Sequence, residues 1–176
     1  MERLKEVLGR FAASMEHAGI PYEVVGGLAV YFQVERVSPD MGRLTRDIDV
    51  LVHRQDVQRI ANAAESFGFL YRHAAGLDML VDAHAPSAAK AIHLVFSAEK
   101  VRPNYAEPTP EIAPERLNSA WVAPVAHLLL MKLTSYRLKD RVHVQDMDNA
   151  GLITPQLEAQ LTEALRLRLA EIRRTE

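Results

Sequence analysis

Apolar residues recur every three or four positions in several stretches of the chain, a spacing that places them on one face of a helix. Glycine or proline stands at ends of these stretches, for example Gly19 and Pro124, and supports the boundaries. A shorter run of this kind follows directly after a pair of glycines. The sequence therefore predicts helices over residues 2–19, 28–33, 55–67, 124–147 and 154–172.

Short runs rich in β-branched and other apolar residues lie between these helices and are typical of strands. In the second run, two aspartates alternate with apolar residues, so one face of that strand is acidic and the other apolar. We expect strands over residues 22–25, 47–52, 77–81, 91–96 and 119–122.

A proline-rich segment, residues 101–114, separates two parts of the chain. Strands and helices alternate before it, whereas helices dominate after it. A second irregular segment, residues 34–44, mixes charge with proline and glycine, and we expect a loop there. The pattern predicts one domain of the α+β class, in which an α/β core (1–105) with a small mixed sheet flanked by helices precedes a helical part (115–176).

The chain of 176 residues has 21 Lys and Arg against 23 Asp and Glu, a net charge of -2, and no cysteine. A charge near zero gives no global attraction for nucleic acid, so such binding would depend on a local patch. The lack of cysteine excludes disulfides, thiolate nucleophiles and Cys-based metal sites. The charged start is unlike a signal peptide, and the longest apolar stretch, residues 121–131, is too short to span a bilayer. We therefore expect a cytoplasmic protein without membrane contact.

Two aspartates, Asp47 and Asp49, are candidates for a metal site. Residues i and i+2 of a strand point to the same face, so the two carboxylates project together. Hard divalent ions such as Mg²⁺ take carboxylate oxygens and leave positions open for phosphate and water. Gly26 and Gly27 stand between a strand and a helix, where backbone N–H groups can approach a phosphate. This combination indicates metal-assisted phosphoryl or nucleotidyl transfer.

The glycine pair after one strand, followed by the run Thr45-Arg46-Asp47-Ile48-Asp49 on the next, resembles the polymerase-β-like nucleotidyltransferases. The closer likeness is to the AbiEii-type toxin branch and its uncharacterised relatives. A later segment is similar to the helical Lys…Arg…Lys/Arg-Asp…Asp pattern of that branch, and it contains Lys132, Arg137, Lys139, Asp140 and Asp146. The resemblance spans about residues 20–150 and implies the polymerase-β-type nucleotidyltransferase fold.

The resemblance also implies roles for individual residues. Asp47 and Asp49 would be catalytic and would hold Mg²⁺, with Mn²⁺ as an alternative. Lys132 would neutralise phosphate charge, and Asp140 would orient Lys132 or help to activate the acceptor. The implied nucleotide-binding residues are Gly26, Gly27, Thr45, Arg46 and Lys132.

Two features depart from the family pattern. Asp47 follows Gly27 by 20 positions, a longer spacing than in the compact members, which implies an inserted loop. The later strand that should carry a third carboxylate offers His93 instead. Imidazole suits zinc or manganese better than magnesium, and it also suits a general base near neutral pH. Asp78 is the alternative third metal ligand.

Three functions are consistent with these residues. The first is a metal-dependent nucleotidyltransferase that moves a nucleoside monophosphate from a nucleoside triphosphate to an acceptor hydroxyl. The acceptor is an RNA 3′ end, a protein or a small molecule such as an aminoglycoside. The resemblance implies an RNA or protein target in a toxin–antitoxin or phage-defence system, with an antitoxin protein as partner. The second is a catalytically weak nucleotide-binding or protein-interaction module on the same fold, which His93 favours. The third is a metal-dependent phosphohydrolase.

A basic run at Arg137, Lys139 and Arg141 has two interpretations. It is either a solvated helix face or a patch that holds a nucleic-acid acceptor or the triphosphate.

Overall fold

The structure is a computed structural model that describes residues 2–43, 45–87 and 90–175. Its strands are β1 (Glu23–Val25), β2 (Ile48–Val52), β3 (Phe69–Ala74), β4 (Leu77–Asp82), β5 (Ile92–Phe96), β6 (Glu115–Leu117) and β7 (Ala120–Val122). Its helices are α1 (Glu2–Ala18), α2 (Gly26–Val37), the short 3-10 helix η1 (Arg54–Asp56), α3 (Val57–Glu65), α4 (Val125–Ser135), α5 (Leu138–Asn149), α6 (Pro155–Ala159) and α7 (Glu163–Arg174).

The seven strands form one mixed sheet in the order β3-β4-β5-β2-β1-β7-β6. β2 lies at the centre, antiparallel to β1 and parallel to β5, and the pair β1 and β7 is also parallel. Val50, Leu51 and Val52 are fully buried, as expected for a central strand covered on both faces. The expected α+β class with a mixed sheet is therefore confirmed.

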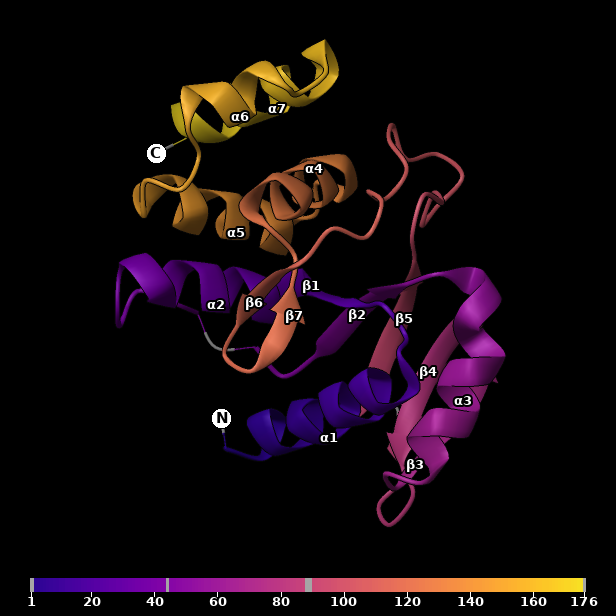
Figure 1. Cartoon of the computed structure of the whole chain (residues 1–176). Helices are drawn as coiled ribbons and strands as arrows, with labels where there is room; N and C mark the ends of the chain where they lie inside the picture. The colour runs from indigo at the N-terminus through magenta and orange to yellow at the C-terminus, as the bar shows by residue number, and fades with distance from the viewer. Residues whose placement is uncertain (1, 44, 88–89, 176) are drawn as a thin grey trace.

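Helices cover both faces of the sheet (Figure 1). α1 and α3 pack against each other on one side, and α2 packs on the other side against β1 and β2. α4 and α5 lie over α2, and α7 forms an outer layer on both of them. Within the described ranges, no helix is both long and apolar enough to cross a membrane.

Two strands were not predicted, and both are edge strands of the sheet. β3 is buried only near its start and its last three residues are exposed, so it lacks the apolar alternation that marks a strand. β6 has only three residues and none of them is buried. Because β6 and β7 join the main sheet, the segment from residue 115 contributes strands to it and is not purely helical.

The predicted helix over residues 124–147 is two helices in the structure. α4 ends at Tyr136, which adopts the left-handed conformation (φ 50°), and α5 begins after Arg137. The carboxylate of Asp140 accepts a hydrogen bond from the backbone N–H of Arg137, which caps the start of α5. Apolar spacing continues across this break, and for that reason the sequence did not reveal it.

Two further boundaries differ from the prediction. α2 begins at the first glycine and runs to Val37, so residues 34–37 are helical where a loop was expected. The last predicted helix is divided into α6 and α7 at residues 160–162, where Thr162 is the N-cap of α7. In both cases burial of apolar residues against neighbouring elements determined the boundary, because Val34 and Leu161 are buried in the main core.

Candidate functional site

The two acidic residues lie at the start of β2. Asp47 is exposed and immediately precedes the strand, whereas Asp49 lies within it and is half-buried. The strand register places Asp49 between Val25 of β1 and His93 of β5. Nδ1 of His93 lies 3.5 Å from Oδ1 of Asp49. The histidine therefore occupies the register position next to the acid, and its role as the third site residue stays a prediction.

The glycine pair connects β1 to α2 beside Asp49. Gly26 has φ 72°, which favours glycine, and a Cβ at this position would collide with Oδ2 of Asp49. The N-cap residue, Val25, provides no side-chain hydrogen bond to the first turn of α2. The N–H groups of that turn thus remain available, and the helix dipole favours an anion there.

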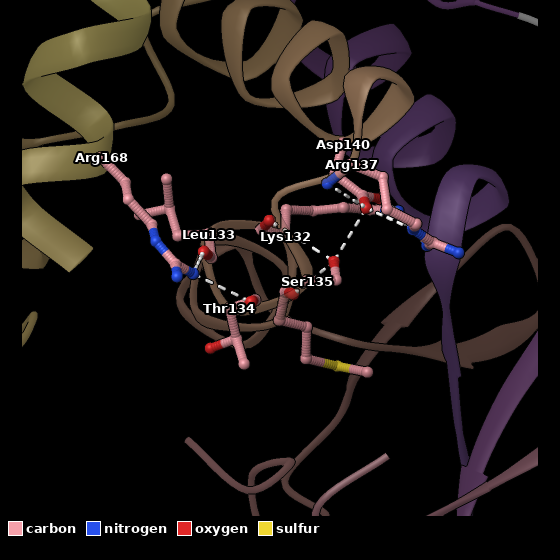
Figure 2. Close-up of polar contacts among 8 residues, drawn as sticks. Lys132, Leu133, Thr134, Ser135, Arg137, Asp140 and Arg168 are labelled. Atoms are coloured by element: carbon pink, nitrogen blue, oxygen red, sulfur yellow. Dashed lines mark hydrogen bonds and ion pairs between the residues drawn. The ribbon is translucent and has the colours of Figure 1, made fainter. Parts of the chain in front are cut away.

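A buried ionic network lies at the junction of α4 and α5 (Figure 2). Nζ of Lys132 donates to Oδ1 of Asp140 at 3.0 Å. Asp140 also accepts hydrogen bonds from Ser135 Oγ at 2.8 Å and from Arg137 Nε at 2.6 Å. Burial raises the pKa of the Asp140 carboxyl, but the hydrogen bond from Arg137 and the charge of Lys132 outweigh burial and hold that pKa well below its usual range. Burial lowers the pKa of Lys132, and the charge of Asp140 opposes this.

Arg168 of α7 fixes the end of α4. Its Nη1 donates to the carbonyl oxygens of Leu133 and Thr134 at 2.6 and 2.9 Å, as Figure 2 shows. The same guanidinium lies 5.0 Å from the ring centre of Tyr136, the residue that terminates α4. Helix α7 therefore stabilises the turn between α4 and α5, which brings Lys132 and Asp140 together.

The start of β2, the glycine turn and the α4–α5 junction all border one cavity of about 640 Å³. Gly26, Asp47, Asp49, His93 and Lys132 all line it. Burial lowers the pKa of Lys132, and the charge of Asp49, like that of Asp140, partly opposes this shift. The walls also carry cationic and aromatic side chains from the α4–α5 junction and from the segment after β5, among them Lys100, Arg102, Tyr105, Arg137 and Lys139.

Other predicted residues lie outside the cavity wall. Asp140 is fully buried and forms an ion pair with Lys132, but it does not line the cavity itself. Thr45 lies beside Gly27, since its Oγ1 would be 3.2 Å from a Cβ there, and it accepts a hydrogen bond from the N–H of Asp47 at 3.4 Å. Arg46 is exposed on the loop before β2.

Asp78 does not join the two aspartates in this structure. It pairs with Leu94 in the β4–β5 register, whereas His93 pairs with Asp49, so Asp78 and Asp49 project from opposite faces of the sheet. Its carboxylate accepts hydrogen bonds from Tyr71 and His73. The expected alternative to His93 thus lines the cavity, but it does not lie beside Asp49.

The two aspartates fit the ion that the sequence suggests. Asp47 and Asp49 supply the hard oxygen donors that Mg²⁺ takes when phosphates and waters complete its shell. Among the described residues, no three Asp, Glu or His side chains converge as a ready-made metal cage. The residues therefore fit an ion that arrives with a nucleotide better than a resident structural ion.

Two features of the site were not predicted from the sequence. Nε of Arg43 donates to both carboxylate oxygens of Asp146 on α5, at 2.9 Å each, and so ties the loop before β2 to that helix. His143 of α5 packs against Gly27. The signal available in the sequence was the three-residue spacing of Asp140, His143 and Asp146, which places them near one face of a helix.

Comparison with known proteins supports the fold. No family model and no curated protein matches the sequence. The crystal structure of ANT(2")-Ia in complex with adenylyl-2"-tobramycin is 12% identical, matches 99% of each chain and has a TM-score of 0.57. The solution structure of the antibiotic-resistance factor ANT(2'')-Ia is 12% identical, with 97% of this chain and 91% of that chain covered and a TM-score of 0.58. An antigenic nucleotidyltransferase-like protein from Paracoccidioides brasiliensis is 17% identical, with 100% and 89% covered and a TM-score of 0.59.

The chain has the nucleotidyltransferase fold. This confirms the fold predicted from the glycine pair and the Asp-Ile-Asp strand. At these identities the likeness concerns the fold alone, and the resemblance to the AbiEii-type branch stays a prediction.

Proposed function

We propose that this chain is a metal-dependent nucleotidyltransferase that moves a nucleoside monophosphate from a nucleoside triphosphate to an acceptor hydroxyl. The observation that supports it is a single cavity lined by an uncapped helix start, two adjacent carboxylates and a buried lysine. These are, in turn, a phosphate site, a site for a divalent ion and a cation for the charge that develops on the phosphates.

In the proposed reaction the acceptor oxygen attacks the α-phosphorus in line with the leaving group. A new P–O bond forms, the bond to the bridging oxygen breaks, pyrophosphate leaves, and the acceptor proton is released. Mg²⁺, or Mn²⁺, held by Asp47 and Asp49 would screen and orient the phosphates. The first turn of α2 binds phosphate oxygens, and Lys132 offsets their negative charge. Asp140 keeps the ammonium of Lys132 charged and in place.

The charges of the cavity favour an anionic acceptor. Arg54 is paired with Glu99, and Lys132 and Arg137 share Asp140. Among the described residues Lys100, Arg102 and Lys139 take part in no ion pair. Of the acids on the wall besides Glu99, Asp47 and Asp49 would face the divalent ion, Asp78 accepts hydrogen bonds from Tyr71 and His73, and Glu107 remains. The guanidinium of Arg102 lies 6.0 Å from the ring centre of Tyr105. Cations beside an aromatic ring suit a nucleic-acid strand, whereas an aminoglycoside with several ammonium groups would be repelled.

Label transfer tests the reaction. The protein is incubated with each α-labelled nucleoside triphosphate, Mg²⁺ or Mn²⁺, and in separate arms RNA, cell lysate protein or an aminoglycoside. We expect label on RNA with the wild type, none with Asp47→Asn or Asp49→Asn, and full transfer with the control Glu65→Gln, an exposed acid on α3. Label on protein or aminoglycoside would overturn the acceptor class only. Release of free phosphate in place of pyrophosphate would identify a phosphohydrolase.

A nucleotide-binding module without catalysis is the second candidate, and His93 is the observation that favours it. It stands opposite Asp49 where the family pattern has a third carboxylate, and the described residues hold no ready three-ligand group. Saturable nucleotide binding by calorimetry without label transfer to any acceptor would establish this function. Absence of nucleotide binding would contradict both candidates.

The toxin role rests on the resemblance to the AbiEii-type branch. If this role holds, induced expression of the wild type arrests growth, whereas Asp49→Asn expressed to the same level does not. A partner antitoxin would then restore growth without changing the level of the toxin. Equal growth of both strains would contradict the role while leaving transfer chemistry intact.

A further inference from the structure

Helix α5 presents three polar residues at three-residue intervals toward the site. Asp140 binds Lys132, and Asp146 binds Arg43 on the loop that leads to Asp47. The ring of His143 lies between these two, against Gly27 in the first turn of α2. Each residue thus contacts a different component of the proposed site. The proposed mechanism assigns no task to His143.

Gly27 is a glycine because of space rather than backbone conformation. Its φ is not positive, in contrast to that of Gly26. A Cβ on Gly27 would lie 3.2 Å from Cε1 of His143, 3.4 Å from Nε2 of His143 and 3.2 Å from Oγ1 of Thr45. Because a methyl group on Gly27 would meet the ring more closely than ordinary packing allows, the imidazole fills the space between the first turn of α2 and α5 up to the glycine.

The imidazole of His143 is held by packing. Burial and the nearby charge of Lys132 lower its pKa to about 4, so the ring is neutral at physiological pH. Its Nδ1 is buried and has no hydrogen-bond partner among the described residues. The fit of the ring against the glycine turn, which leaves no room for a methyl group on Gly27, is therefore the feature that sets this side chain apart.

We infer that His143 is a positioning residue, which sets the place of the Gly26–Gly27 turn relative to Asp49 and thereby the place of the nucleotide phosphates. This rests on the proposed function, since it assumes that the turn binds a triphosphate. Asp49 fixes the turn from the side of Gly26, and His143 fixes it from the side of Gly27. A small displacement of this turn moves the α-phosphorus away from the in-line geometry that transfer needs.

Four variants and one control test the inference. They are His143→Ala, His143→Phe, Gly27→Ala, the double variant Gly27→Ala/His143→Ala, and the control Gln145→Ala on the same helix. Affinity for a non-hydrolysable nucleoside triphosphate with Mg²⁺ is measured by calorimetry, KM and kcat by label transfer, and stability by urea unfolding.

We expect His143→Ala and Gly27→Ala each to weaken nucleotide affinity by about tenfold or more, with a rise in KM larger than the fall in kcat. His143→Phe keeps a flat ring and restores most of the affinity. In the double variant the new methyl group occupies the space that the ring leaves, so it binds nucleotide more tightly than Gly27→Ala does. Gln145→Ala binds as the wild type.

Three results would overturn the inference. The first is nucleotide affinity that is unchanged in His143→Ala, whatever its stability. The second is a double variant whose loss equals the sum of the two single losses, since independent sites behave in this way. The third is equal loss in His143→Phe and His143→Ala. Lack of nucleotide binding by the wild type itself would instead refute the proposed function, and that result is recognised because every variant shares it.

Discussion

The acidic and the cationic parts of the site are built in opposite ways. At the start of β2, Asp47 is exposed and the side chain of Asp49 retains 31% of its exposure. At the α4–α5 junction, the side chains of Lys132 and Asp140 retain 6% and 0%. Asp140 accepts hydrogen bonds from Lys132, Ser135 and Arg137, whereas Oδ1 of Asp49 lies 3.5 Å from Nδ1 of His93.

The cationic junction is therefore a preformed element, whereas the acidic start of β2 is open to receive an ion. The cationic junction is already satisfied, so a ligand meets a fixed positive group that needs little rearrangement. The carboxylates keep open oxygen atoms that can bind an ion together with phosphates. We therefore expect changes at the acids to affect catalysis, and changes at the junction to affect folding as well as catalysis.

Replacing an acid should give the largest effect. Asp49→Asn removes charge but keeps shape, so we expect nucleotidyl transfer to fall by about 10³-fold or more. The free energy of unfolding should change by less than about 0.5 kcal/mol, because the group is partly solvated. Label-transfer rates and urea unfolding check the two parts. A large decrease in the free energy of unfolding would show instead that Asp49 is a structural residue and not one that is open to an ion.

Breaking the junction should cost stability first. Asp140→Ala leaves Lys132 buried without its main partner, and we expect a loss of about 3–5 kcal/mol in urea unfolding. The double variant Lys132→Met/Asp140→Leu removes both buried charges and should recover part of this loss, while transfer stays low in both. If Asp140→Ala is as stable as the wild type, the junction is not the preformed element described above.

Acid should weaken the protein in two separate pH ranges. The pKa of His143 is about 4 in the folded protein and about 6.5 in the unfolded chain, so between these values the unfolded state binds a proton that the folded state does not. Stability therefore falls as pH falls from 6.5 to 4, by about 1–2 kcal/mol once solvent screening is allowed for. Asp140 has a lowered pKa, so its contribution is present above about 3.9 and is lost below that pH.

Urea midpoints across these pH values, measured for the wild type and His143→Phe, separate the two ranges. The variant should lose the slope between pH 6.5 and 4 and keep the decline at lower pH. An unchanged slope in the variant would assign it to another group.

The loop before β2 should give the smallest effect. Arg43 pairs with Asp146, but its side chain is 64% exposed, so Arg43→Ala should lower stability by less than about 1 kcal/mol. Because this pair ties the loop carrying Asp47 to α5, we expect kcat/KM to fall by roughly two- to fivefold. Arg43→Lys keeps the charge but loses the Nε–H that the two carboxylate oxygens share, so its kcat/KM should lie between the values for the wild type and Arg43→Ala. A loss of stability as large as that of Asp140→Ala would show that the loop is part of the core.

Much of the fold followed from local patterns. Apolar spacing located α1 and α3, and β-branched runs located β2, β4 and β5. The edge strands β3 and β6 gave no such signal, since few of their side chains are buried. Their structure depends on hydrogen bonds to a neighbouring strand rather than on their own sequence.

The candidate site was predicted unevenly for a related reason. Gly26, Asp47 and Asp49 are recognisable because backbone conformation and strand alternation are local properties. Asp78 was equally acceptable in sequence, and only the strand register places it on the face away from Asp49. For His143 the only local signal was its three-residue spacing from Asp140 and Asp146, which does not by itself distinguish it from a surface histidine.

The sequence by itself determined the central strands, the glycine turn and the position of the two aspartates on one strand. Only the tertiary structure decided how Lys132 meets Asp140. Eight residues along a continuous helix would separate them by about 12 Å, because each residue adds about 1.5 Å. The left-handed Tyr136 ends α4, α5 starts in a new direction, and the two charged groups come within 3.0 Å. That break is stabilised by Arg168 from a distant helix, so no local pattern could predict it.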